Sequence, residues 1–206
     1  VLVDTNVLVD ALLDRLIQRS GRSVRAGLAI DANRDLHHHL ERLGASGTIQ
    51  LMLPNPVRHE LTSIARGGKV LNDRLRETFA TPDDIEAILE TTNVEEALND
   101  VLSSFETWAK REERYDDEAM EDDRVARLDA FLVQHHDVYD EVTAMKRQRG
   151  APQRTAIGTG AEVYPEKEDR EIMCLAMRLA EIPLEDFGAV LVATRDSDFT
   201  LVAPSM

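Results

Sequence analysis

Two short apolar runs, each followed within three residues by a carboxylate, lie near opposite ends of the chain. Val1–Val3 leads into Asp4, and Val190–Ala193 leads into Asp196. Continuous apolar runs are typical of parallel strands that are covered by helices on both faces. In open α/β sheets, ligands bind outside the carboxyl ends of the strands. The two runs therefore predict a sheet that brings carboxylates from distant parts of the sequence to one acidic site.

The sequence between the two runs is mostly of helical character. Helical spacing predicts helices after residue 6, over about 26–43, over 57–66, from 81 to about 146 with breaks near 93 and 116–118, and over about 166–180. Residues 48–53 form a further strand candidate. This order predicts an α/β fold with a mostly parallel central sheet flanked by helices. We expect a single domain, 1–206, with an all-helical acidic insertion at about 70–150.

The composition excludes several classes of protein. A chain of 206 residues can bury a sizeable core. No apolar run approaches the roughly 18 residues that a membrane span needs, and no signal-peptide pattern is present. The single cysteine, Cys174, excludes an intramolecular disulfide and lies among apolar residues, so we expect a buried thiol. These features predict a cytoplasmic protein without a membrane partner.

The charge is unevenly distributed along the chain. The formal net charge is −15, which argues against a nucleic-acid partner. Residues 15–76, however, carry a net +6, whereas residues 77–129 carry −13. Arg15 and Arg19 begin a series of arginines spaced three or four residues apart, a pattern that places them near one helix face. They could contact phosphates, or they could form ion pairs with the acidic segment.

Two internal acids lie on predicted apolar helix stripes. Glu60 is three residues after Val57, within a stripe that continues through Leu61 and Ile64. Asp169 lies at the start of the apolar stripe of the helix predicted over about 166–180. An inward carboxylate needs a cation, a metal or several donors. The alternatives are a solvated or Arg-paired Glu60, and an Asp169 that only stabilises a helix N-terminus.

The terminal run is followed by Asp196 and Asp198. Two aspartates in this position often only stabilise a turn, because an Asp side chain hydrogen-bonds the backbone nearby in the sequence. Together with Asp4, Glu60 and Asp169 the pair would form an acidic cluster, in which like charges raise one another's pKa unless a cation is bound. Mg²⁺ and similar hard ions prefer oxygen ligands. The cluster is therefore consistent with a Mg²⁺ or Mn²⁺ site for phosphodiester hydrolysis.

These motifs together resemble the PIN domain, a family that includes VapC-type toxins of toxin–antitoxin pairs and RNA-processing nucleases. The resemblance rests on Asp-Thr-Asn at 4–6, Glu60 within 58–61, Asp169 with its helix stripe, and Thr-Arg-Asp-Ser-Asp-Phe at 194–199. It covers about residues 1–66 and 155–202 and leaves out the central helical segment.

The resemblance implies a metal-dependent endoribonuclease. Asp4, Glu60, Asp169 and Asp196 would be the catalytic, metal-binding acids, and Asp198 would be an auxiliary ligand. Asn6 and Thr194 would hydrogen-bond the acids or the substrate phosphate, and Arg15 and Arg19 would hold the RNA backbone. The implied cofactor is Mg²⁺ or Mn²⁺. RNA is the expected partner, with an antitoxin protein and a second copy of the chain as further candidates.

The acidic residues are also compatible with two other functions. A structure-specific DNA nuclease would use the same chemistry. A non-catalytic module for binding nucleic acid or protein would retain the acids without using them.

Three consecutive histidines, His37–His39, form another candidate metal tract. Consecutive helical residues point about 100° apart. We therefore expect a solvated helix face there and no metal site.

Overall fold

A computed structural model describes residues 1–21, 28–67, 71–72, 75–76, 82–106, 119–137, 165, 167–182 and 188–194, with the backbone alone for 28–35 and 82. The chain divides into two compact units. The first consists of Val1 and Val3–Lys110, and the second of Leu2 and Arg111–Met206.

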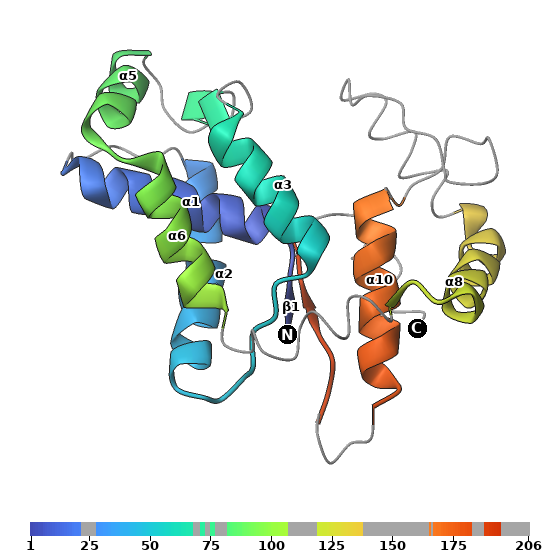
Figure 1. Ribbon diagram of the computed structural model, residues 1–206. Coiled ribbons are helices and arrows are strands. Elements are labelled where there is room, and N and C mark those ends of the chain that lie inside the picture. Colours follow the sequence, from blue (N-terminus) through green and yellow to red (C-terminus); the bar gives the residue numbers. More distant parts are fainter. Residues whose placement is uncertain are drawn as a thin grey trace. The chain divides into compact units, whose positions relative to one another are not determined.

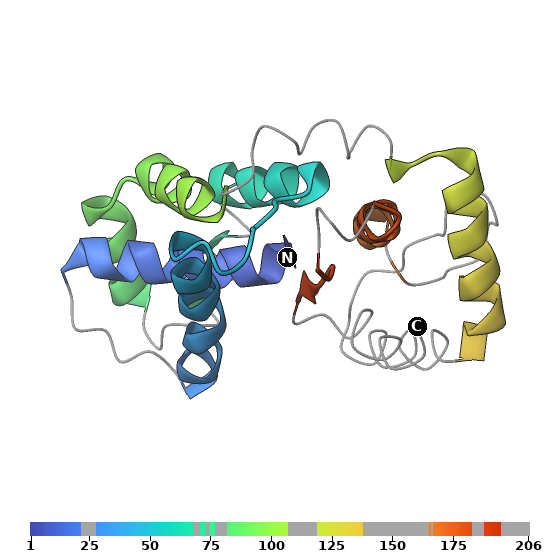
Figure 2. The same cartoon turned by 90° about the horizontal axis from the view of Figure 1, so that it is seen from below.

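A helix occupies the centre of the first unit. Helix α1 (Thr5–Ser20) packs against α2 (Leu28–Ala45), α3 (Asn55–Arg66), α5 (Pro82–Thr91) and α6 (Val94–Phe105), and Figures 1 and 2 show α2 crossing it steeply. A helix that is apolar on nearly all sides is buried. Accordingly, α1 buries most of its length, at positions 5, 7–9, 11–14, 16 and 17.

Local sequence explains where these helices begin and end. Asp4 is the N-cap of α1, and Gly21 ends that helix in the left-handed conformation at φ 65°, which glycine adopts without a Cβ clash. Pro56 lies in the first turn of α3, where a missing N–H costs nothing. Asn93, near which the sequence predicted a break, accepts a hydrogen bond from the N–H of Glu96 and caps α6.

In the part of the chain that the structure describes, extended structure is confined to short segments. Strand β1 (Leu2–Val3) and strand β2 (Val192–Ala193) form a two-stranded parallel sheet. Within the first unit, Met52 donates to the carbonyl of Val1 at 2.9 Å and accepts from the N–H of Val3 at 3.1 Å, in a parallel arrangement. The predicted strand over 48–53 is thus reduced to a single bridge. Pro54 follows at once and has no N–H to extend the pairing.

The prediction of a mostly parallel central sheet flanked by helices is wrong. Across the described residues the structure has seven helices of ten residues or more and two strands of two residues each. Two physical causes are local. The first apolar run cannot lengthen as a strand because Asp4 immediately caps a helix, and the segment ending at Leu53 is stopped by proline. The core position expected for a sheet is occupied by α1.

The central acidic segment contributes to both units. Helices α5 and α6 pack on α1 in the first unit, whereas α8 (Asp122–Gln134) packs against α10 (Lys167–Ala180) in the second, as Figure 1 shows for each unit. Cys174 of α10 is fully buried, which confirms the expected buried thiol, and burial raises the pKa of its sulfur. Within the described part of the chain, no helix is both long and apolar enough to cross a membrane.

Candidate functional site

The N-terminal end of α1 brings Asp4, Asn6 and Glu60 to one place, with Thr5 between them. One carboxylate oxygen of Asp4 accepts from the N–H of Thr5 at 2.7 Å, and the other faces the Nδ2 of Asn6 at 3.4 Å. The hydroxyl of Thr5 donates to Oε2 of Glu60 at 2.7 Å. Residues 55 positions apart in the sequence are thereby joined directly. Two of the four predicted metal-binding acids thus lie on either side of one threonine.

The two acids differ in exposure. Asp4 is only 4% exposed, and its charge faces the positive end of the α1 dipole, which stabilises a carboxylate. Glu60 is exposed, although its spacing predicted an inward position. The buried side chains of α3 are those of Val57, Leu61, Ile64 and Ala65, and at 100° per residue the centre of this stripe lies roughly a quarter turn from Glu60. Glu60 therefore lies on the flank of the stripe, where the Thr5 hydroxyl reaches it.

The remaining predicted acids are not all described. Asp169 lies half-buried in the first turn of α10, and Thr194 directly follows β2; both belong to the second unit. Asp196 and Asp198 lie outside the described residues. Within the first unit, the structure brings two members of the predicted cluster, Asp4 and Glu60, together.

Both arginines that were expected to contact RNA are engaged with carboxylates. Arg15 donates to Glu41 at 2.6 Å. Arg19 pairs with Glu96 at 2.6 Å and also with Asp100, and the hydrogen bonds that it donates to Asp100 and Glu96 raise its pKa above the ordinary value. Arg19 therefore forms ion pairs with the acidic segment, which was the alternative to phosphate contacts, and its partners lie on α6.

A second cluster, which the sequence analysis missed, consists of Asp14 on α1 with His37 and His38 on α2. Nε2 of His38 lies 3.3 Å from Oδ2 of Asp14, and Nε2 of His37 lies 3.8 Å from the same oxygen. The three side chains offer ligand atoms within 4.8 Å of one another, enough to hold a metal ion.

The expectation of a solvated histidine face is wrong for His37, which is 1% exposed. The side chains do diverge at Cβ, but the imidazoles are long enough for the rings of His37 and His38 to approach to 4.2 Å between centroids. His38 and His39 are both exposed, as expected, and His39 contacts Arg42. The signal that could have revealed the cluster is Asp14, a carboxylate within a helix that is apolar on nearly all sides and therefore needs a partner.

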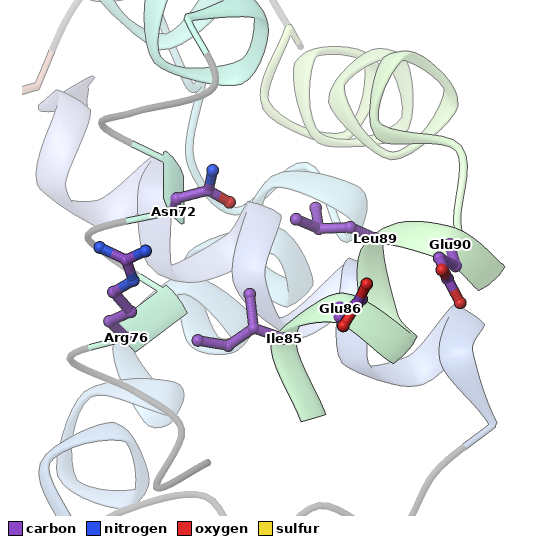
Figure 3. A pocket seen from close by; sticks show the side chains of 6 residues that line it. All are labelled: Asn72, Arg76, Ile85, Glu86, Leu89 and Glu90. Atoms are coloured by element: carbon purple, nitrogen blue, oxygen red, sulfur yellow. The ribbon is translucent and has the colours of Figure 1, made fainter. Parts of the chain in front are cut away.

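A separate pocket of about 390 Å³ opens to solvent beside α5. Figure 3 shows its lining, in which the apolar Ile85 and Leu89 stand between the polar side chains. The other lining residues are Asn72, Arg76, Glu86 and Glu90. None of the residues predicted to form the metal site contributes to it.

Comparison of the chain with models of protein families, with curated proteins and with solved structures found no match. The geometry of the two clusters and the sequence motifs therefore carry the functional argument.

Proposed function

We propose that the protein is a divalent-metal-dependent nuclease that hydrolyses phosphodiester bonds in RNA. The observation that carries the proposal is the hydrogen bond from the Thr5 hydroxyl to the carboxylate of Glu60. It gathers two acids from distant segments beside the N-terminal end of α1.

The residues at the site fit a hard divalent cation. Asp4 and Glu60 supply carboxylate oxygens, the ligands that Mg²⁺ and Mn²⁺ prefer. The PIN resemblance adds Asp169, Asp196 and Asp198 to the proposed ligand set. When bound, such an ion supplies Lewis-acid stabilisation of the negative charge that develops on the phosphate and lowers the pKa of the attacking water.

The neighbouring polar groups hold the acids in place. Thr5 fixes Glu60 through its hydroxyl and Asp4 through its backbone N–H, so one residue orients both carboxylates. Asn6 faces the second oxygen of Asp4. A carboxylate that is oriented in this way needs no rearrangement when it takes up a cation, and such preorganisation is what metal sites obtain from residues outside the ligand set.

The choice of RNA as substrate rests on the PIN resemblance and on the net positive charge of residues 15–76. It does not rest on Arg15 and Arg19, which are paired with acids. An RNA substrate fits activity in the cytoplasm. An antitoxin that blocks the carboxylates would be the corresponding protein partner.

The test uses charge-neutralising variants that keep the fold. Asp4→Asn retains a good helix N-cap, because Asn and Asp cap about equally well, and Glu60→Gln retains an acceptor for Thr5. Cleavage of single-stranded RNA in the presence of Mg²⁺ or Mn²⁺ should fall at least about 100-fold in each variant, since each removes a proposed metal ligand. Glu95→Gln is the matched control, because its side chain is 74% exposed and its ion pair is with Arg66, which is outside the proposed ligand set.

Each alternative outcome is informative. RNA cleavage that survives in both variants, or that persists in a chelator, would overturn the proposal. Metal-dependent cleavage of structured DNA but not of RNA would favour the DNA nuclease. RNA that is bound but never cut, with or without metal, would favour a non-catalytic binding module.

A further inference from the structure

The Asp14–His37–His38 cluster joins two helices through groups that ligate metals. We propose that these three residues form a binding site for a first-row transition metal of the Zn²⁺ class. The site is independent of the proposed nuclease centre. It would connect the middle of α1 to the C-terminal half of α2.

The spacing of the ligand atoms suits one small ion. Metal–nitrogen and metal–oxygen bonds of about 2.0–2.2 Å at tetrahedral angles place neighbouring ligand atoms roughly 3.4 Å apart. The Oδ2 of Asp14 lies 3.3 Å from Nε2 of His38 and 3.8 Å from Nε2 of His37. These two separations bracket the ideal value, and all three ligand atoms lie within 4.8 Å of one another, so side-chain rotations that draw the atoms together would complete the geometry.

A second observation points to a bound ligand. His37 is 1% exposed, and neither of its ring nitrogens has a hydrogen-bond partner among the described residues. A buried imidazole without partners is unfavourable, because both polar atoms have left water without compensation. A metal ion on Nε2 would satisfy one of them. The nitrogen already faces Asp14 at a distance too long for a hydrogen bond.

The surroundings resemble the outer shell of a metal site. Metal-binding histidines usually direct their second ring nitrogen to a carboxylate, which fixes the ring. Nδ1 of His38 lies 3.7 Å from Oε2 of Glu41, and Arg15 holds the other oxygen of Glu41 at 2.6 Å. On the other side, Gln18 donates to Oδ2 of Asp14 at 2.6 Å. Glu41 therefore lies beside His38 at a separation longer than a hydrogen bond, and a side-chain movement would bring it into the position of a carboxylate that orients a ligating histidine.

The donor set selects the kind of metal. Two imidazoles and one carboxylate favour Zn²⁺, Ni²⁺ or Co²⁺ over Mg²⁺, which prefers oxygen ligands alone. Three protein ligands leave a fourth position for water in a tetrahedral site. The side chain of His38 is 45% exposed and gives the ion a path from solvent.

The experiment compares two neighbouring histidines. The full chain, prepared without a polyhistidine tag and stripped of metal by a chelator, is titrated with Zn²⁺ in competition with a chromophoric chelator and with Co²⁺ by visible absorption. We expect one ion per chain, Co²⁺ bands typical of a tetrahedral site, and a higher melting temperature with Zn²⁺, because binding to the folded state alone stabilises it.

Single-residue variants show whether Zn²⁺ binds at the cluster and not at other histidines. His38→Gln should weaken Zn²⁺ binding by more than about 100-fold, and Glu41→Gln by about 10–100-fold as the loss of an outer-shell partner. Since His38 is partly exposed, its replacement should leave the fold intact. His39→Gln, on the same helix but outside the cluster, is the matched control and should bind Zn²⁺ as the wild type does.

The proposal would be overturned if the wild type bound no Zn²⁺, or if His38→Gln bound Zn²⁺ as tightly as the wild type. It would also be overturned if the His38 and His39 variants lost Zn²⁺ affinity equally, because that would indicate adventitious binding to surface histidines. Asp4→Asn and Glu60→Gln should not alter Zn²⁺ affinity. The nuclease proposal can therefore fail while the Zn²⁺ site stands, and the reverse also holds.

Discussion

At the scale of single residues, a polar side chain at a helix N-terminus can serve structure alone or structure and chemistry together. Asp4 caps α1 and also lies one residue from the threonine that binds Glu60. Asn93 caps α6 by accepting from the N–H of Glu96 at 3.2 Å. Both follow the ordinary preference for short polar acceptors at this position. What distinguishes Asp4 is the second carboxylate beside it.

The cap at Asn93 gives a prediction about stability. Asn93→Ala should lower the free energy of unfolding by about 1 kcal/mol, because an N–H at the start of α6 loses its acceptor. Asn93→Asp is the control and should be close to neutral, since Asp accepts the same hydrogen bond. Urea unfolding followed by circular dichroism measures both. An alanine variant as stable as the aspartate variant would show that the cap contributes nothing.

At the scale of elements, a buried arginine holds the C-terminal end of α10 to α8. The side chain of Arg124 is 5% exposed; it donates to the carbonyl of Ala119 at 2.9 Å and to Glu181 at 2.8 Å. The more exposed Arg127 donates to the other oxygen of Glu181 at 2.8 Å. A cation that is removed from water needs such partners. Glu181 is therefore expected to matter more to α8 than a surface ion pair would.

This contact predicts a pH dependence. The hydrogen bond from Arg124 is the main cause that lowers the pKa of Glu181, so the folded protein holds this proton less tightly than the unfolded chain does. The stability from the carboxylate is present above the unfolded pKa, about 4.3, and is lost as the pH falls through the lower folded value.

Glu181→Gln should therefore reduce the protection of α8 and α10 amides from hydrogen exchange at pH 7. The difference from wild type should shrink at pH values below about 4. Arg127→Gln serves as the control, because its exposed ion pair should contribute less than about 1 kcal/mol. If Glu181→Gln lost the same amount of amide protection at neutral and at acidic pH, the carboxylate of Glu181 would not be the source of the stability.

At the scale of the whole molecule, charge opposes compactness. The net charge is −15, and the acidic excess is concentrated in residues 77–129. Ion pairs such as Arg19 with Glu96 offset part of it, but exposed pairs contribute little. Repulsion among the remaining carboxylates should therefore destabilise the folded chain at low ionic strength.

Added NaCl should raise the melting temperature at pH 7, measured with a chelator present to exclude metal binding. Salt shortens the Debye length from about 30 Å at 0.01 M to about 3 Å at 1 M, which screens the repulsion. Near the isoelectric point, about pH 4.8, the same addition should have little effect. A melting temperature that falls with salt at pH 7 would mean that attractive ion pairs outweigh the repulsion.

Features set by neighbouring residues could be predicted from the sequence. The break at Asn93 and the start of a helix beside Pro82 depend on backbone preferences within a few positions, and the structure confirms both. The burial of Cys174 followed from its apolar neighbours at helical spacing. In each case the free energy that decides the outcome comes from groups close in the sequence.

Tertiary structure decided the rest. Apolar runs at 1–3 and 48–53 are compatible with parallel strands. Asp4 and Pro54 limit the length of those strands locally, but which segments pair depends on partners far along the chain. The sequence could not show that α1, and not a sheet, fills the core of the first unit.

The same distinction applies to the two sites. The types of residue at Asp4 and Glu60 are evident in the sequence, and so are the histidines. That Glu60 is exposed yet bound to Thr5, and that His37 is buried against Asp14, depends on how α3 and α2 pack on α1. Sequence by itself determined the chemical groups and the local helices that carry them. Only packing between helices decided which of those groups meet, because burial and ligand geometry are set by contacts that no local pattern encodes.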